Sequence, residues 1–93
     1  EARSGAGYTP LHRAAAHGHT TVVRCLCEQG ADKEARDYRG MTPLHIAAGH
    51  GYLHVVKLLC EQRADKGARC RIGKTPLENC GHNSAAAYLK ETE

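Results

Sequence analysis

Apolar residues along the chain alternate between two kinds of segment. The first kind begins with Thr-Pro-Leu and continues into alanines, as in residues 9–16 and 42–48. In the second kind, valines and leucines fall three or four residues apart, which is the spacing of one buried helical face. These positions are Val22, Val23 and Leu26, followed later by Val55, Val56, Leu58 and Leu59. The pattern therefore predicts pairs of short helices, each with an apolar side.

The Thr-Pro pairs predict where the first helix of each pair begins. A threonine before a helix accepts a hydrogen bond from a free N–H of the first turn, and proline suits the first helical position because it has no N–H to satisfy. We expect first helices from Pro10 to about Ala16 and from Pro43 to about Ala48. Residues 75–78, TPLE, fit the capping-box pattern of a third such helix.

Glycines predict where the helices end. Gly18 and Gly51 follow the first helices, and Gly30 follows a second helix, at the position where a left-handed residue commonly closes a helix. The stretch DKEARDYRG that comes next has no long apolar period and ends in glycine, so it predicts a turn or an extended connection. We call residues 30–41 the first finger and the matching residues 63–74 the second finger.

The same phrases recur with a period of 33 residues. The TPL triplet starts at Thr9, Thr42 and Thr75, and residues 20–37 align with residues 53–70 at the same interval. One helix pair is too small to bury its apolar faces alone, whereas stacked pairs bury them against one another. The sequence therefore predicts an all-α solenoid.

This period and its motifs resemble those of a known family. The motifs G-x-TPLH-x-A-A, V-V-x-x-L and G-A-D resemble the ankyrin repeat over essentially the whole chain. The resemblance implies helix-turn-helix units with β-hairpin-like fingers at right angles to the helices, and it implies protein binding. We expect one ankyrin-repeat domain over residues 1–93, from a larger protein. Its expected units are a partial finger of a preceding repeat at 1–7, repeat 1 at 8–40, repeat 2 at 41–73 and a shortened C-terminal repeat at 74–93.

Composition fits a small domain of closely packed helices. The 93 residues include no Phe or Trp and only four Tyr, so Ala, Leu and Val must fill the core. Five cysteines, an odd number with no C-x-x-C pair, argue against a disulfide scaffold and predict a reducing compartment, the cytosol (cytoplasmic) or the nucleus. No segment is apolar and long enough to predict a membrane span.

The residue pattern offers little support for metal binding or catalysis. His12 and His45 belong to the TPLH motif, for which the resemblance implies a local hydrogen-bond network. Cys80 and His82 would supply two ligands, whereas structural zinc takes four. The two serines lie near opposite ends of the chain, and no nucleophile-elbow, zinc-protease or phosphate-loop motif is present. We therefore expect no metal, no cofactor and no enzymatic activity.

Departures of the second finger from the first predict local differences. Arg63 stands where Gly30 closes the earlier helix, and Cys70 replaces Asp37. We expect strain at Arg63, because a left-handed backbone disfavours side chains. The resemblance implies that the aspartate braces the turn, so Cys70 predicts weaker local order, and we expect its thiol to lie outward or at an interface. Cys25, at the repeat position of a core leucine, should pack in the core.

Positive charge is concentrated on the second finger. The net charge of the chain is +3, and the first finger is balanced, whereas the second finger has a local charge of +4. Its charged residues are Arg63, Lys66, Arg69, Arg71 and Lys74, against Asp65. Binding of single-stranded nucleic acid usually combines such a surface with stacking aromatics. Because the second finger has none, we do not expect nucleic acid as the partner.

The resemblance implies a contact surface made of the finger tips and the exposed face of the first helices. At these positions the chain has Tyr8, Arg13, His17, Tyr38, Arg39, Met41, His50, Arg71, Ile72 and Lys74. Interfaces favour Tyr, Arg and Met. We expect a monomer that binds a protein partner with an acidic, partly apolar patch. Two alternatives stay open, namely a structural spacer or engineered scaffold without a partner of its own, and a weak binder of anionic polymers through the second finger.

Overall fold

The computed structural model describes residues 8–80 and 84–91, and this part of the chain forms six helices and no strand. The helices are α1 (Pro10–Ala16), α2 (Thr20–Glu28), α3 (Pro43–His50), α4 (Leu53–Glu61), α5 (Pro76–Cys80) and α6 (Ser84–Glu91). The predicted helix pairs are therefore confirmed. None of the helices described combines the length and the hydrophobicity that crossing a membrane requires.

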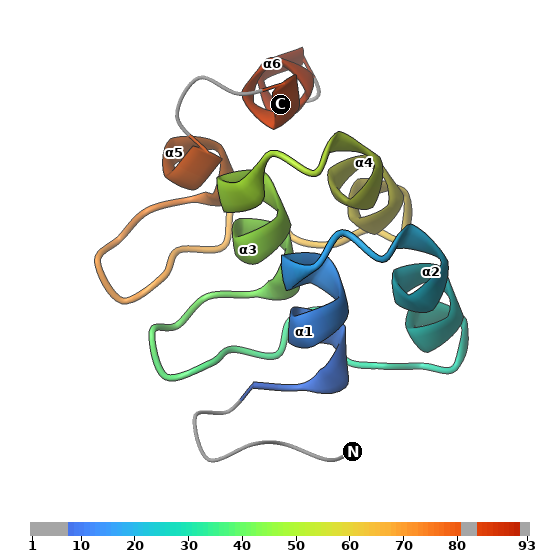
Figure 1. The fold of residues 1–93 in the computed structure, drawn as a ribbon. Coiled ribbons are helices and arrows are strands. Elements are labelled where there is room, and N and C mark those ends of the chain that lie inside the picture. Colours follow the sequence, from blue (N-terminus) through green and yellow to red (C-terminus); the bar gives the residue numbers. More distant parts are fainter. Residues whose placement is uncertain (1–7, 81–83, 92–93) are drawn as a thin grey trace.

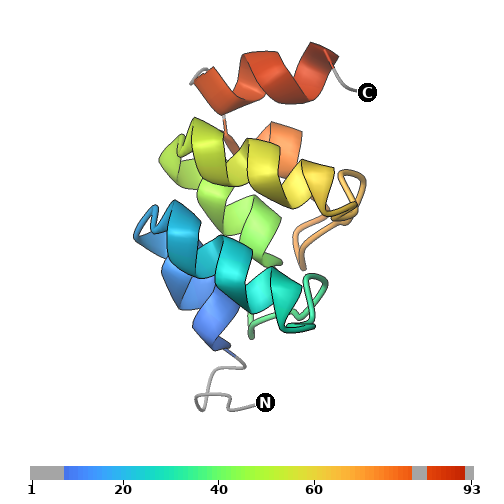
Figure 2. The same ribbon diagram turned by 90° about the vertical axis from the view of Figure 1, so that its right-hand side faces the viewer.

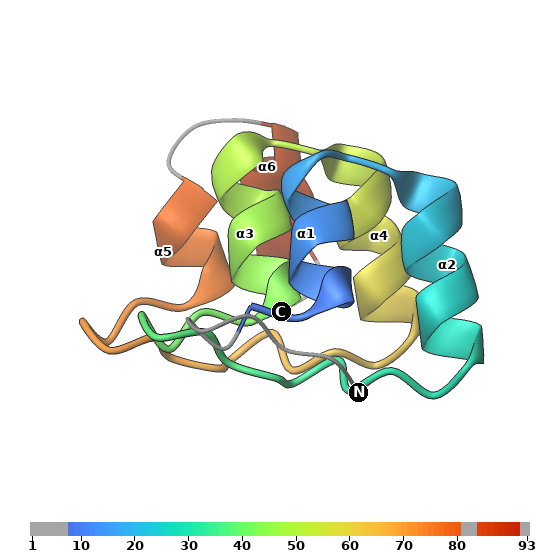
Figure 3. The same cartoon turned by 60° about the horizontal axis from the view of Figure 1, so that its bottom comes forward.

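The helices form two layers, and the fingers extend away from them. Helices α1, α3 and α5 lie side by side in one layer, and α2, α4 and α6 lie in the other (Figures 1 and 2). The two fingers run next to each other beneath the helices in the view of Figure 3. The main packing contacts join each helix to its partner in the pair and to the equivalent helix of the neighbouring pair. This is the nearest-neighbour stacking of a solenoid.

Capping boxes begin the first helices, as the Thr-Pro pairs predict. The Thr9 side chain accepts a hydrogen bond from the His12 amide, and the His12 ring accepts one from the Thr9 amide. The same geometry recurs one period later at the start of α3. At α5 a carboxylate replaces the imidazole, since the Thr75 amide donates to Glu78 Oε1 at 2.9 Å and the Glu78 amide donates to Thr75 Oγ1 at 3.3 Å.

Left-handed residues end the helices where glycine was expected to do so. Gly51 closes α3 with φ 75°, and Gly30 follows α2 with φ 87°. Arg63 follows α4 with φ 68°, and it is the one non-glycine residue with positive φ in the described chain. Its predicted left-handed conformation is confirmed. Helix α1 spans the residues expected of it, whereas α3 continues past Ala48 to His50.

Small aliphatic side chains fill the space between the layers. The largest fully buried apolar side chains are Leu11, Leu44, Leu59, Leu89, Val23, Val55 and Val56. Three alanines, Ala15, Ala47 and Ala48, are also completely buried, which lets the first helices approach closely. Burial of a Leu or Val side chain is worth about 1.5–3 kcal/mol. The core therefore needs no aromatic residue, and Tyr38 and Tyr52 stay at the surface.

The outer side of α2 differs from the apolar pattern. Val22 is 47 % exposed, whereas Val55, one period later, is 1 % exposed. Cys25 is also exposed, so its expected place in the core is wrong. Within the second layer, helix α4 lies between α2 and α6, whereas α2 has α4 as its one neighbour in that layer among the helices described (Figure 2). The same repeat position is therefore covered in one unit and open in the other.

Candidate functional site

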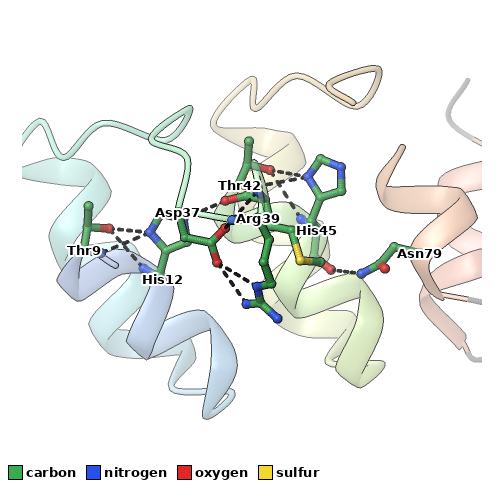
Figure 4. Close-up of polar contacts among 8 residues, drawn as sticks. Thr9, His12, Asp37, Arg39, Thr42, His45 and Asn79 are labelled. Carbon is green, nitrogen blue, oxygen red and sulfur yellow. Dashed lines mark hydrogen bonds and ion pairs between the residues drawn. The ribbon is translucent and has the colours of Figure 1, made fainter. Parts of the chain in front are cut away.

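Two histidines connect the first helices to the finger tips. The Thr9 amide donates to His12 Nδ1 at 3.2 Å, so Nδ1 is an acceptor and Nε2 holds the ring proton. His12 Nε2 then donates to the carbonyl oxygen of Met41 at 2.8 Å. His45 makes the equivalent bond to the Lys74 carbonyl oxygen, also at 2.8 Å. Figure 4 shows both histidines with the threonines that cap their helices. The end of each finger is thus attached to the first helix of the helix pair that precedes the finger in the chain.

Burial keeps the ring of His45 neutral. His45 is completely buried, and this burial lowers the pKa of its ring below the ordinary value of 6.5, although the bond to the Lys74 carbonyl opposes the shift. A neutral imidazole has one donor and one acceptor, and His45 uses both. The hydrogen-bond network implied by the TPLH motif is therefore present, and it holds the fingers to the first helices.

Asp37 fixes the tip of the first finger. Its Oδ1 accepts from the amides of Arg39 at 2.9 Å and Met41 at 3.0 Å. Its Oδ2 accepts from Arg39 Nη2 at 2.9 Å and Arg39 Nε at 3.2 Å (Figure 4). Burial raises the pKa of Asp37, but the hydrogen bonds outweigh burial and hold the pKa below its usual range. The Asp37 side chain is completely buried, and its carboxylate neutralises the guanidinium of Arg39 from inside the finger.

Cys70 takes the place of Asp37 in the second finger without loss of the turn. Its amide donates to the Lys74 carbonyl at 3.0 Å, and the Gly73 amide donates back to the Cys70 carbonyl at 2.9 Å. Burial raises the pKa of the thiol, but hydrogen bonds from backbone amides, including those of Lys74 and Ile72, lower it by more. Cys70 is 9 % exposed, so of the two placements expected for its thiol the outward one is wrong. The turn has the same backbone hydrogen bonds as the first finger, which does not support the expected weaker order. A sulfur atom at this position can accept the bonds that the carboxylate accepts in the first finger.

The two fingers are joined to each other. The Arg71 amide donates to the Arg39 carbonyl at 3.0 Å, and the guanidinium of Arg36 donates to the carbonyls of Arg69 and Gly40. Gly40 has φ 76°, and a Cβ placed on it would lie 2.8 Å from the Arg71 nitrogen. Only glycine fits so close a contact. The relative position of the finger tips is therefore set before any partner binds.

A hollow of about 370 Å³ lies between the finger tips and α5. We call it the tip groove. Its lining residues are Tyr38, Arg39, Met41, Cys70, Arg71, Ile72 and Asn79. A second hollow of about 320 Å³, the helix groove, runs along the first helices. It is lined by Tyr8, Arg39, Met41, Ile46, Gly49, His50 and Asn79. Since three residues line both hollows, the grooves adjoin.

The grooves bring together most of the residues expected in the contact surface. Those in the tip groove are Tyr38, Arg39, Met41, Arg71 and Ile72, and those in the helix groove alone are Tyr8 and His50. Arg13, His17 and Lys74 are exposed but line neither groove. The ring of His17 stacks on His19 with centroids 5.7 Å apart, and Lys74 contributes its backbone carbonyl to the His45 bond.

Asn79 lines both grooves and is not among the residues expected from the sequence. Its Nδ2 donates to the His45 carbonyl at 2.9 Å, which attaches α5 to α3 (Figure 4). Gly49 makes room for it, because a Cβ there would lie 2.8 Å from Asn79 Nδ2. Asn79 occupies the repeat position of Ile46 and Arg13, and this alignment was sufficient to find it.

The described residues hold no group of three or more His, Cys, Asp or Glu side chains arranged to bind a metal ion. The Cys80 side chain and His82 lie outside the part that the structure describes in detail. Comparison with family models gives a match to ankyrin repeats, in three copies, over residues 1–70 and 35–92. A search among curated proteins gave no match.

Proposed function

Because the chain belongs to the ankyrin-repeat family, whose members generally bind proteins, we propose that it binds a protein partner through its finger tips and the exposed face of its first helices. The observation that supports this proposal is the pair of adjoining grooves on that side of the molecule. They contain seven of the ten residues expected at the contact surface. We propose no catalytic role for any of them.

The residue types in the grooves suit an interface. Tyr38 is 63 % exposed and Ile72 is 76 % exposed, and both line the tip groove. Large apolar side chains left this open gain free energy when a partner covers them. Arg and Tyr are the residue types on which binding energy most often depends. The fixed positions of the finger tips reduce the entropy lost on binding.

Charge indicates the character of the partner. The tip groove has two arginines and no acidic lining residue, and Lys66, Arg69 and Lys74 lie elsewhere on the second finger. We propose that the chain, as a monomer, binds a partner with an acidic, partly apolar patch. The dissociation constant should be about 1 μM or below. The charges should act mainly on the association rate and on its salt dependence. On the evidence of its cysteine usage, we propose a reducing compartment, the cytosol or the nucleus.

The test begins with a pull-down and continues with measured affinities. A partner recovered with the folded domain is titrated against alanine variants of Tyr38, Arg39, Met41, Arg71 and Lys74. Truncation of Tyr38 should cost about 1–2 kcal/mol of binding free energy. Matched control variants on the second helices are Arg24→Ala in α2 and His54→Ala in α4, both exposed. If the controls abolish binding and the five finger variants do not, the contact surface is on the layer of the second helices.

The basic second finger favours one further function, the weak binding of an anionic polymer. Such binding would weaken steeply with salt, because each neutralised phosphate releases counterions. A polyanion that binds more tightly than any recovered protein would favour this second function. Failure to recover any partner would favour a spacer or scaffold role.

A further inference from the structure

The two arginines of the tip groove are electrostatically different, although both are exposed. The guanidinium of Arg39 lies 2.9 Å from Asp37 Oδ2 and 5.7 Å from the centroid of the Tyr38 ring. Asp37 has a completely buried carboxylate, so a competing acid would have to leave that carboxylate without its cation. Arg71 forms no ion pair with any residue in the described chain. Arg71 is therefore the cation that is available to a partner.

The apolar part of the groove lies on both fingers. Tyr38 comes from the first finger and Ile72 from the second, with Met41 as a third apolar wall. Tyr38 and Arg71 occupy the same repeat position, as do Arg39 and Ile72. The fingers lie side by side and are bonded at Arg71 N and Arg39 O, and the apolar and cationic side chains of both fingers line the same groove. An occupant thus meets apolar surface and the free guanidinium together.

The geometry points to an extended acidic segment of the partner as the occupant of the tip groove, with one large aliphatic side chain among Tyr38, Met41 and Ile72 and a neighbouring carboxylate on Arg71. This inference rests on the proposed function and names the ligand class for the same surface. A volume of about 370 Å³ accommodates one such side chain with its flanking backbone. Asn79 also lines the groove, and its Nδ2 donates to the His45 carbonyl oxygen. Its side-chain oxygen could therefore accept a hydrogen bond from a backbone N–H of the segment.

Three peptides that differ at one feature test the inference. The probe is a capped peptide with one leucine between two aspartates and glycines outside them. The second peptide has asparagines in place of the aspartates, and the third has alanine in place of the leucine. Each is titrated to millimolar concentration against the isotope-labelled domain, and backbone amide shifts are followed by NMR. We expect the probe to shift the amides of Tyr38, Met41 and Ile72, and to bind about two- to five-fold better than the asparagine peptide.

Variants then separate the two arginines. In Arg71→Gln the preference for aspartate over asparagine should disappear, whereas Arg39→Gln should retain it. Ile72→Ala should reduce the preference for leucine over alanine by about three- to ten-fold. The inference would be overturned if Arg71→Gln kept the wild-type preference for aspartate over asparagine, or if the peptide shifted only amides of α2 and α4. It would also be overturned if the amide shifts changed with protein concentration in the absence of peptide. No binding by any peptide would also overturn it, but the proposed function would stand if a folded partner still lost affinity in the groove variants.

Discussion

Exchange of the residues that follow α2 and α4 gives the most direct test of the backbone geometry. Gly30 and Arg63 occupy the same position in successive units, with φ 87° and 68°. Each donates its amide to the carbonyl three residues back, Gly30 to Cys27 at 3.1 Å and Arg63 to Cys60 at 3.0 Å. The next amide bonds the carbonyl five residues back in both units, which completes a Schellman motif. One backbone conformation is therefore present with a glycine and with a side chain.

The expected gain from Arg63→Gly follows from two opposing terms. An L-residue in the left-handed region costs about 1–2 kcal/mol relative to the right-handed form. Glycine removes this cost but raises the entropy of the unfolded chain, which offsets about 0.4–1 kcal/mol. Arg63 is exposed, and no hydrogen bond or ion pair to its side chain occurs among the residues described. The net stabilisation should be about 0.5–1 kcal/mol, or about 3–6 °C in Tm for a chain of this size.

The reverse change should have the opposite sign and a similar size. No heavy atom lies within 4 Å of a Cβ placed on Gly30, so Gly30→Arg meets no steric clash and pays only the conformational cost. Urea denaturation of the wild type, both single variants and the double exchange measures the free energies of unfolding. Arg63→Ala is the matched control, since alanine keeps the left-handed strain but removes the charge.

Two results would refute this reasoning. A neutral or destabilising Arg63→Gly would mean that the arginine holds a compensating interaction in solution. An Arg63→Ala variant as stable as Arg63→Gly would assign the gain to relief of charge repulsion on the second finger. In either case the predicted net gain from relief of the left-handed backbone would be wrong.

Three further outcomes are expected. Because burial lowers the pKa of His45, the unfolded chain binds more protons than the folded chain between that lowered pKa and 6.5, so the His45 contribution to stability should be complete above pH 6.5 and fall as the pH drops below it. Urea denaturation from pH 7.5 to pH 5 measures this fall. An equally steep fall in the His45→Gln variant would assign the effect to other groups. Cys70→Asp should stabilise the chain by about 1 kcal/mol, because a carboxylate is a stronger hydrogen-bond acceptor for the turn amides than sulfur. A lower melting temperature for Cys70→Asp than for the wild type would contradict this. Gly40→Ala should destabilise the chain by more than the roughly 1 kcal/mol expected for Gly73→Ala. A Cβ at Gly73 meets no heavy atom within 4 Å, whereas one at Gly40 meets the backbone of Arg71. Equal losses of unfolding free energy in denaturant melts would show that the two fingers separate easily.

The sequence predicted those features that depend on residues close together in the chain. The Thr-Pro-Leu-His boxes, the bounds of α1 and the left-handed Arg63 follow from capping and turn chemistry over a few residues. For α2, by contrast, the sequence predicted the helix but not which of its sides would be buried. Val22 and Cys25 lie 33 residues before buried residues of α4, yet they are exposed on a side that no described helix covers. Burial depends on neighbours in space, which a period alone does not supply.

The candidate site was predicted less completely than the fold. The resemblance supplied the residue positions of the finger tips, and the structure places most of them in two grooves. It did not predict that Arg39 would be neutralised by Asp37 while Arg71 stays available, because this difference requires the three-dimensional position of one carboxylate. Nor did it predict that the turn would form with Cys70 in place of the aspartate. The motif specifies an aspartate there, whereas the backbone hydrogen bonds of the turn form with either residue.

The hydrogen bonds that cross between units have a consequence for folding speed. His12 bonds to Met41 and His45 bonds to Lys74, each 29 residues along the chain, and Asn79 bonds to His45 across 34 residues. The main helix contacts likewise join only adjacent units. The entropy of loop closure depends on the length of the loop that is closed, so each such contact closes a loop of about one period, however many units are stacked. Addition of further units would therefore lower the relative contact order, and a longer array of such units should nucleate at any adjacent pair and grow outward without a slower, long-range step.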